Sequence, residues 1–316
     1  MQIIGREAVE SALSPALCLQ LSRDAFTLVS AGKVRQTLRS VIAADQGCLM
    51  GTMPAYIAEG PWAGFGLKTV KVDFSHRDGR SSHEGCILLY DATATGEMAL
   101  VDAASVTELR TAAASALATD LLAPPDAQRL AILGTGVQAR QHALMMMAVR
   151  PFRQLFLWGR REESVAAFAR WCRERLDLVV TVAPTPAAAV SNAEVICTVT
   201  AAKAAFLHRR DLPPRCHINA VGASAPGFQE IAPEVYAAVE LYVDARQAVW
   251  DASSCLQQAR DQGLLPQTQR GIELGERLSV GDAPKAAAPR TLFKSVGLAA
   301  QDLVFARAIV ARQPLR

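Results

Sequence analysis

The chain has 316 residues, of which 51% are apolar, and its 33 basic and 30 acidic side chains leave a formal net charge of +3. This length and apolar fraction suit about two domains with hydrophobic cores. The near balance of charge, without a basic run that carries interleaved aromatic residues, argues against a nucleic-acid partner. No apolar stretch approaches the ~20 residues that cross a bilayer, so we expect no membrane partner.

The seven cysteines form no CxxC pair, and neither they nor the five histidines show the spacing of metal ligands. We therefore expect free thiols in a reducing compartment and no metal site. The first residues, MQIIGREAVESAL, lack a charged segment followed by an apolar core. This pattern predicts a cytoplasmic protein without a signal peptide.

The first third of the chain predicts a helical segment followed by a sheet. Residues 5–30 have helical periodicity, whereas residues 39–102 contain short β-prone segments separated by glycine, proline and aspartate, which favours an antiparallel sheet. Ser105 and Glu108 have the spacing of a capping box, which predicts the start of a long alanine-rich helix. Pro124 and Pro125 then end that helix and mark a domain boundary.

The centre of the chain, residues 129–160, reads as strand, glycine turn, helix and strand. This order, with GTGVQA at the turn, is the opening unit of a dinucleotide-binding fold. Gly134 permits the tight turn, Gly136 lets the backbone approach a pyrophosphate, and the helix N-terminus favours phosphate. The predicted cofactor-binding residues of this turn are Gly134, Thr135, Gly136, Val137 and Gln138. The alternative is a tight turn in a sheet that binds no ligand.

After this unit, strand-like and helical segments continue to alternate, which predicts a doubly wound, mostly parallel sheet. The predicted fold class is therefore α/β, with a Rossmann domain and a smaller α+β domain that carries an antiparallel sheet. We expect a substrate-binding and dimerisation domain at residues 1–123 and a Rossmann domain at 124–291. Residues 292–316 are expected to form a C-terminal helix that returns to the first domain.

The end of the second strand of this unit bears on the choice of cofactor. An NAD-preferring site usually presents an acidic side chain there to the ribose hydroxyls. This chain has Arg160 and Arg161 instead, with no acid until Glu162. Arg160 can pair with a 2′-phosphate, so we expect NADP(H) to be preferred, with NAD(H) possible. The alternative is that Arg160 stacks on the adenine or points to solvent.

Several separated stretches, in order along the chain, resemble the ornithine cyclodeaminase/μ-crystallin family. They read GKVRQTLR, GTMPAY, GLK, LRTAAASALAT, LGTGVQA, HINAVG and LFKSVGLAAQD. The resemblance implies hydride transfer between a nicotinamide cofactor and the α-carbon of an amino or imino acid, and a homodimer that forms through the antiparallel sheet. It also adds Thr200, Val221, Gly222, Lys294 and Gly297 to the expected cofactor-binding residues.

The family positions also indicate which residues act on the substrate. Arg39 and Arg110 are expected to bind a carboxylate, because the planar guanidinium binds carboxylates with two hydrogen bonds. Lys68 matches a family lysine near the carboxylate and the α-nitrogen, where a lowered pKa would suit it to proton transfer. Ser82 is expected to supply a hydroxyl group to the substrate. The alternative for both arginines is a solvated surface position.

Ser224 is the most informative departure from the family pattern. Cyclodeaminases carry aspartate after the glycine pair, where it is thought to bind the distal amino group of ornithine. Because a serine cannot act as that base, the resemblance favours an imino-acid reductase or amino-acid dehydrogenase, with Ser224 in the catalytic site. Two alternatives stay open: an ornithine cyclodeaminase that forms proline and ammonia, and a nicotinamide-nucleotide-binding protein without turnover.

Overall fold

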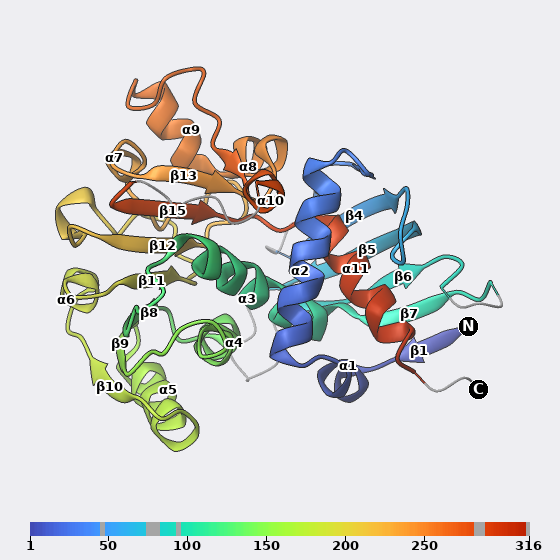
Figure 1. Cartoon of the computed structure of the whole chain (residues 1–316), viewed down its shortest axis with the longest axis horizontal. Coiled ribbons are helices and arrows are strands. Elements are labelled where there is room, and N and C mark those ends of the chain that lie inside the picture. Colours follow the sequence, from blue (N-terminus) through green and yellow to red (C-terminus); the bar gives the residue numbers. More distant parts are fainter. Residues whose placement is uncertain (45–47, 74–82, 93–95, 281–287, 314–316) are drawn as a thin grey trace. The chain divides into compact units, whose positions relative to one another are not determined.

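The computed structural model describes residues 1–44, 48–73, 83–92, 96–280 and 288–313. The chain divides into two compact units (Figure 1): unit 1 comprises Met1–Arg110 and Leu298–Arg316, and unit 2 comprises Thr111–Gly297. The sequence placed the boundaries at 123/124 and 291/292, whereas the two compact units divide inside the long helix and just before the last one. No helix within the described ranges is long and apolar enough to span a membrane.

Unit 1 is built on a mixed sheet. Within the described residues it has seven strands in the order β1-β7-β6-β5-β4-β2, and β3 also pairs with β4. The strands are β1 (Gln2–Ile4), β2 (Val34–Gln36), β3 (Ser40–Ala43), β4 (Leu49–Ile57), β5 (Gly64–Val72), β6 (His83–Leu89) and β7 (Ala99–Asp102). Apart from the parallel β1–β7 pair, the described pairs are antiparallel, which confirms the sheet type predicted from the sequence.

Helices cover one face of this sheet. Apart from the start of the long helix described next, the helices in the described part of unit 1 are α1 (Arg6–Ala12), α2 (Pro15–Ser30) and α11 (Ala299–Val310). The Ser14 hydroxyl accepts the Leu17 N–H at 3.3 Å, and Pro15 occupies the first turn, so α2 begins with a favourable cap. Figure 1 shows α2 and α11 side by side, and α11 contacts β4, β5 and β6. The alternation of buried and exposed positions along β4 and β5 follows from this one-sided cover.

The long helix α3 (Ala103–Leu122) does not begin as the sequence predicted. Its cap is Asp102, whose carboxylate accepts the Ser105 N–H at 2.8 Å. The predicted capping box is therefore wrong, since Glu108 instead receives two hydrogen bonds from Arg6 at 2.9 Å. The alanines of the second half are fully buried, as close packing of neighbouring backbone requires. At its end the Arg150 guanidinium donates to the carbonyls of Thr119, Asp120, Ala123 and Pro124.

Unit 2 is built on a parallel sheet, in the order β10-β9-β8-β11-β12-β15-β13-β14. Its strands are β8 (Arg129–Leu133), β9 (Gln154–Trp158), β10 (Val179–Val182), β11 (Val195–Thr198), β12 (Cys216–Ala220), β13 (Glu240–Val243), β14 (Ile272–Glu273) and β15 (Arg290–Lys294). Strand order reverses between β8 and β11, so the doubly wound fold predicted from the sequence is confirmed. β15, which the sequence reading did not identify as a strand, lies between β12 and β13.

Short helices connect these strands. They are α4 (Val137–Met146), α5 (Glu162–Arg175), α6 (Pro186–Val190), η1 (Arg209–Asp211), α7 (Pro233–Tyr236), α8 (Arg246–Ala252), α9 (Ser254–Asp261) and α10 (Leu274–Ser279). The helix after the glycine turn lies where the sequence predicted it. Because the described strand pairs of unit 2 are parallel, the carboxyl ends of β8, β11, β12 and β15 share one edge of the sheet.

Two histidines inside unit 2 belong to a buried hydrogen-bond network. His142 donates through Nδ1 to the Gln138 carbonyl at 2.8 Å and accepts from the Ser115 hydroxyl at Nε2, at 2.9 Å. His217 donates to Asn219 Oδ1 at 3.2 Å and accepts from the Thr291 hydroxyl at 2.8 Å. Both rings are fully buried, and burial lowers the pKa of His142 to about 4 and that of His217 to about 3.

These neutral histidines should make folding sensitive to acid. Below pH 6.5 the unfolded histidines take up protons that the folded ones cannot, so the free energy of unfolding falls as the pH falls. Two such groups predict a slope of about 2.5 kcal/mol per pH unit near pH 5. Urea unfolding at several pH values between 5 and 7 measures this slope. His142→Gln should remove about half of it, and an unchanged slope in that variant would contradict the assignment.

Candidate functional site

The sequence of β5 places a lysine among apolar residues of the covered face. Lys68 pairs in register with Met53 on β4 and with Ile87 on β6, and both neighbours are buried. Because side chains alternate along a strand, Lys68 shares the inward face with Gly66, and it is only 3% exposed. Lys71 lies on the opposite face and is exposed, as the alternation requires.

Lys68 belongs to a buried cluster of charged side chains in unit 1. Its Nζ donates to Thr107 Oγ1 at 2.7 Å and to Asp302 Oδ1 at 3.1 Å. Arg110, from α3, donates through Nε to the same Asp302 oxygen at 3.2 Å. Asp302 lies in the first turn of α11, where the helix dipole favours a carboxylate. One carboxylate oxygen thus joins residues from β5, α3 and α11.

The surroundings of Lys68 shift its proton affinity. Burial lowers the pKa of Lys68 to about 8; Asp302 raises it, while the charges of Arg110 and Arg39 lower it further. A lysine in this range carries a proton at neutral pH and can release it at little cost. The lowered pKa that the family resemblance led us to expect is therefore present in the structure.

The two arginines of the sequence prediction have different exposures. Arg110 is 4% exposed, so the alternative that it is a solvated surface residue is wrong. Its two terminal nitrogens have no hydrogen-bond partner in the described part of the chain, which leaves the outer edge of the guanidinium free to bind a ligand. Arg39 is half-buried, follows β2, and is close enough to Lys68 to affect its pKa.

Asp302 and Thr107 were not among the predicted site residues. Asp302 has a second oxygen, Oδ2, that is buried without a partner among the residues described. An acidic residue in the first turn of the mostly apolar segment AAQDLVFARAIV is the signal that could have identified it. The remaining predicted substrate residue, Ser82, lies outside the described residues.

In unit 2, the predicted glycine turn has the geometry that a dinucleotide requires. Gly134 has φ of +128°, and a Cβ there would lie 2.7 Å from the Val199 carbonyl oxygen, so no other residue fits. Gly136 is the N-cap of α4 without a side-chain cap, and no atom lies within 4 Å of the Cβ position it lacks. No side chain caps the start of α4, which lies at the point where strand order reverses, and folds of this type bind phosphate there. Thr135, Val137 and Gln138 accompany them in this turn.

Arg160 lies just after β9, is exposed, and has no hydrogen-bond or ion-pair partner among the described residues. Its guanidinium is available to a negatively charged group. Glu162 and Glu163 begin α5 immediately afterwards, and their side chains occupy the first helical turn. Arg160 therefore lies exposed at the end of the second strand of the unit, at the position that the sequence singled out.

The other predicted cofactor residues gather at the same edge of the sheet. Thr200 follows β11, and Val221 and Gly222 follow β12. Lys294 ends β15 and is buried, and its Nζ donates to the carbonyls of Ala223 at 2.6 Å and Ala220 at 3.4 Å. Gly297 has φ of +80°, and its N–H donates to the buried Asp244 carboxylate at 2.8 Å. Ser224 is half-buried in the segment after β12.

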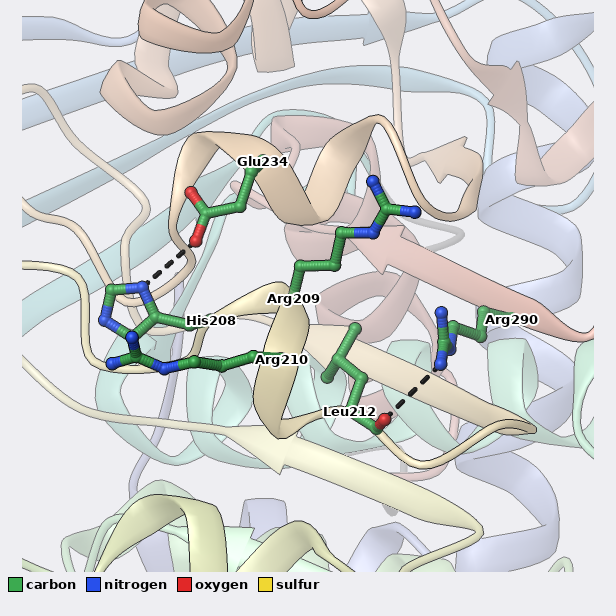
Figure 2. A pocket seen from close by; sticks show the side chains of 6 residues that line it. All are labelled: His208, Arg209, Arg210, Leu212, Glu234 and Arg290. Atoms are coloured by element: carbon green, nitrogen blue, oxygen red, sulfur yellow. Dashed lines mark hydrogen bonds and ion pairs between the residues drawn. The ribbon is translucent and has the colours of Figure 1, made fainter.

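A separate pocket of about 600 Å³ opens elsewhere in unit 2. Figure 2 shows its lining side chains, His208, Arg209, Arg210, Leu212, Glu234 and Arg290, with His208 Nδ1 bound to Glu234 at 3.0 Å. Arg290 begins β15 and η1 precedes β12, so this pocket lies at the amino edge of the parallel sheet. Ligands of such sheets bind at the carboxyl edge, and none of the predicted site residues lines this pocket.

Comparison with known proteins agrees with this arrangement. The chain is 36% identical over 282 residues to the ketimine reductase mu-crystallin of Mus musculus, which covers 88% of this chain and 85% of the relative. It is 33% identical over 263 residues to a Delta(1)-pyrroline-2-carboxylate reductase of Bacillus cereus, covering 82% and 80% respectively.

The fold is shared with a solved structure, that of Thermococcus litoralis Delta(1)-pyrroline-2-carboxylate reductase in complex with NADH and L-proline. The TM-score is 0.91 at 25% identity, and the match covers 98% of this chain and 97% of the other. The model of the ornithine cyclodeaminase/mu-crystallin family matches residues 2–313, which confirms the resemblance found in the sequence. This chain is therefore a member of the ornithine cyclodeaminase/mu-crystallin family.

Proposed function

We propose that this protein is an NAD(P)-dependent oxidoreductase that reduces an α-imino acid to the amino acid, or catalyses the reverse oxidation. The observation that carries the proposal is the buried cluster of unit 1, in which Lys68 and Arg110 converge on Asp302 while the outer edge of Arg110 stays free. Among the described residues these two cations share one carboxylate, and this excess of positive charge suits an anionic substrate.

In this proposal the guanidinium of Arg110 binds the substrate carboxylate. Its Nε is held by Asp302, so the planar group has a fixed orientation, and its two terminal nitrogens can donate a pair of parallel hydrogen bonds. Arg39, which is less buried, contributes a second positive charge to the same carboxylate. The α-carbon next to that carboxylate is thereby held in place for reaction.

Lys68 then supplies the proton that reduction requires. When an imine is reduced, the electron pair of the carbon–nitrogen double bond moves to nitrogen, which must take up a proton. Lys68 is protonated at neutral pH and has a pKa of about 8, so it can donate to that nitrogen and recover a proton afterwards. In the reverse direction the neutral amine of Lys68 accepts the proton.

The cofactor would be held by the glycine turn of unit 2. Gly134 and Gly136 leave room for the pyrophosphate at the start of α4, which has no side-chain cap. Thr200, Val221, Gly222 and Gly297 belong to loops at the same sheet edge, where Lys294 ends β15. The bound dinucleotide supplies or accepts a hydride at the α-carbon. The free guanidinium of Arg160 supports a preference for NADP(H) over NAD(H).

The substrate-binding sheet also supports a homodimer. Its uncovered face carries an apolar row that crosses five strands in register, formed by Ile3, Leu100, Leu88, Leu67 and Pro54. Beside it, Tyr56 and Phe65 pack with ring centroids 4.4 Å apart, and Phe65 and Ile3 are 59% and 76% exposed. An exposed apolar face of this extent is typical of a protein interface, and a second copy would cover it.

The reaction can be tested with purified protein, NADPH and Δ1-pyrroline-2-carboxylate, where each imine reduced should oxidise one NADPH. Arg110→Lys keeps the charge but loses the planar pair of donors, so kcat/KM should fall about 100-fold. Arg6→Lys is the matched control, since Arg6 also pairs with a carboxylate of unit 1 but at the surface.

The competing activity has a distinct signature. Because Ser224 replaces the acidic residue of cyclodeaminases, ornithine with catalytic NAD should give little ammonia or proline. If ammonia and proline form at ~1 s⁻¹ or faster without net oxidation of the cofactor, the protein is an ornithine cyclodeaminase and the proposed reductase activity is wrong. Binding of a cofactor without either reaction would instead indicate a nicotinamide-nucleotide-binding protein without turnover.

The role of Lys68 predicts a pH dependence. Reduction should slow as the pH rises through about 8, because Lys68 then loses the proton that it must donate. Asp302→Asn removes the charge that raises the pKa of Lys68, so the descending limb of kcat/KM should move to lower pH. Glu108→Gln, on the same helix as Arg110, should leave the limb in place. A limb that stays fixed in Asp302→Asn would refute the pairing.

Cofactor preference can be measured by fluorescence titration. Arg160→Ala should weaken NADPH binding by roughly 10- to 100-fold, because a charge-assisted hydrogen bond to the 2′-phosphate is lost, and should leave NADH binding nearly unchanged. Arg161→Ala is the neighbouring control. Tighter binding of NADH than of NADPH to the parent protein would show that the predicted preference is wrong.

The dimer can be tested by light scattering. The parent protein should have twice the chain mass of 33.8 kDa at micromolar concentration. Phe65→Glu places a charge on the apolar face and should give monomers, whereas Val179→Glu, at an exposed apolar position of unit 2, should not. A parent protein that stays at the mass of one chain would exclude the interface.

A further inference from the structure

The segment that follows β12 touches the segment that follows β11. A Cβ on Gly222 would lie 2.1 Å from the Thr200 carbonyl oxygen and 2.4 Å from Glu230 Oε1. Only glycine allows this approach, so the two segments are in direct backbone contact. Both emerge at the carboxyl edge of the sheet, on neighbouring strands, and Ser224 lies two residues beyond Gly222.

Glu230 holds these two segments together although it belongs to neither. Its Oε1 accepts from the Thr200 N–H at 2.6 Å and from the Thr200 hydroxyl at 2.8 Å. Its Oε2 accepts from the Thr198 hydroxyl at 2.8 Å and from the Ala223 N–H at 3.3 Å. The side chain is fully buried, and its carboxylate accepts these four hydrogen bonds in place of solvent.

Lys294 binds Ala223 as well, through the carbonyl group of that residue. Its Nζ donates to the Ala223 oxygen at 2.6 Å, while the Ala223 N–H donates to Glu230. The ammonium of Lys294 is 1% exposed, and its charge attracts that of Glu230. Ala223, the residue directly before Ser224, is therefore bound on its two backbone polar groups by two buried groups of opposite charge.

We propose that Glu230 and Lys294 are positioning residues, which clamp Ala223 and so fix the cofactor-binding segments at 199–200 and 221–224. This inference rests on the proposed function for the ligand concerned, a nicotinamide dinucleotide. Glu230 does not itself need to touch the cofactor, and its effect passes through Thr200, Gly222 and Ala223. Lys294, which the sequence assigned to cofactor binding, acts through its hydrogen bonds to the main chain.

The stability of the folded protein does not by itself explain why Glu230 and Lys294 are buried together. Taking two charges out of water costs several kcal/mol each, and apolar residues of similar size often serve the folded state as well or better. The carboxylate and the ammonium instead give directed hydrogen bonds to named backbone groups of two adjacent segments. Such bonds fix backbone position, which matters where the segments must meet a ligand.

The experiment compares Glu230→Gln and Lys294→Met with the parent protein by hydrogen exchange and by fluorescence titration with NADPH and NADH. In both variants, amides of residues 221–224 should exchange at least about tenfold faster without cofactor, since a charge-assisted bond that held them is lost. The dissociation constant for the cofactor should rise about tenfold or more. Glu234→Gln, a surface carboxylate four residues further on, should change neither.

The outcomes separate this inference from the proposed function. The variants could instead have lower melting temperatures while amide exchange at 221–224 and cofactor affinity stay within about twofold of the parent. That result would mean that Glu230 and Lys294 serve stability only, and it would overturn the clamp. If Glu230→Gln does not fold, Thr198→Val removes a single donor to the same carboxylate and should show the same changes in weaker form. A parent protein that binds neither cofactor would refute the proposed function, while exchange at 221–224 would still test the clamp.

Discussion

The buried charged cluster of unit 1 is held together by one carboxylate oxygen of Asp302. This oxygen accepts from Lys68 on β5 and from Arg110 on α3, which lie 234 and 192 positions away in the chain. Without this carboxylate, two cations would be buried together with no opposite charge, which costs far more than an exposed pair would gain. The carboxylate also holds Arg110 through one nitrogen only, so the two terminal nitrogens are left for an external anion. The same contact therefore stabilises the buried cluster and leaves Arg110 able to bind an anion.

Unit 2 uses buried charge in a related way. Glu230, Asp244 and Lys294 are fully or almost fully buried, and each bonds mainly to backbone groups or hydroxyls of segments at the carboxyl edge of the sheet. Burial raises the pKa of Glu230 and of Asp244, opposed in each case by the hydrogen bonds that the carboxylate accepts. Several loops follow parallel strands at one edge of the sheet, and no hydrogen-bond ladder between strands orders these loops. Buried side-chain acceptors and donors perform that ordering here.

The two units thus carry complementary chemistry. Unit 1 collects positive charge and a lysine whose pKa of about 8 lies near neutrality. Unit 2 offers a helix start without a side-chain cap at α4 and closely packed glycines, which suit a large anionic ligand rather than a reacting group. The pocket at the amino edge of the sheet is also lined by arginines, but no lysine and no glycine lines it, and it lies away from the edge at which doubly wound folds bind their ligands.

The sequence by itself determined the elements whose signal is local. The strand–glycine–helix unit at 129–160, the alternating pattern of unit 2 and the antiparallel strands of unit 1 follow from periodicity and turn residues within short windows. Family motifs added the positions of Lys68, Arg39 and Arg110. Only the tertiary structure decided which polar groups become partners: Asp102 caps α3 in place of Ser105, Asp302 meets Lys68, Glu230 meets Thr200, and β15 enters the sheet between β12 and β13. The cap of α3 is a local contact, and Glu108 cannot complete the predicted box because Arg6, 102 positions away, binds it. The other contacts join residues far apart in the chain, and burial, which no local pattern records, is what makes them strong.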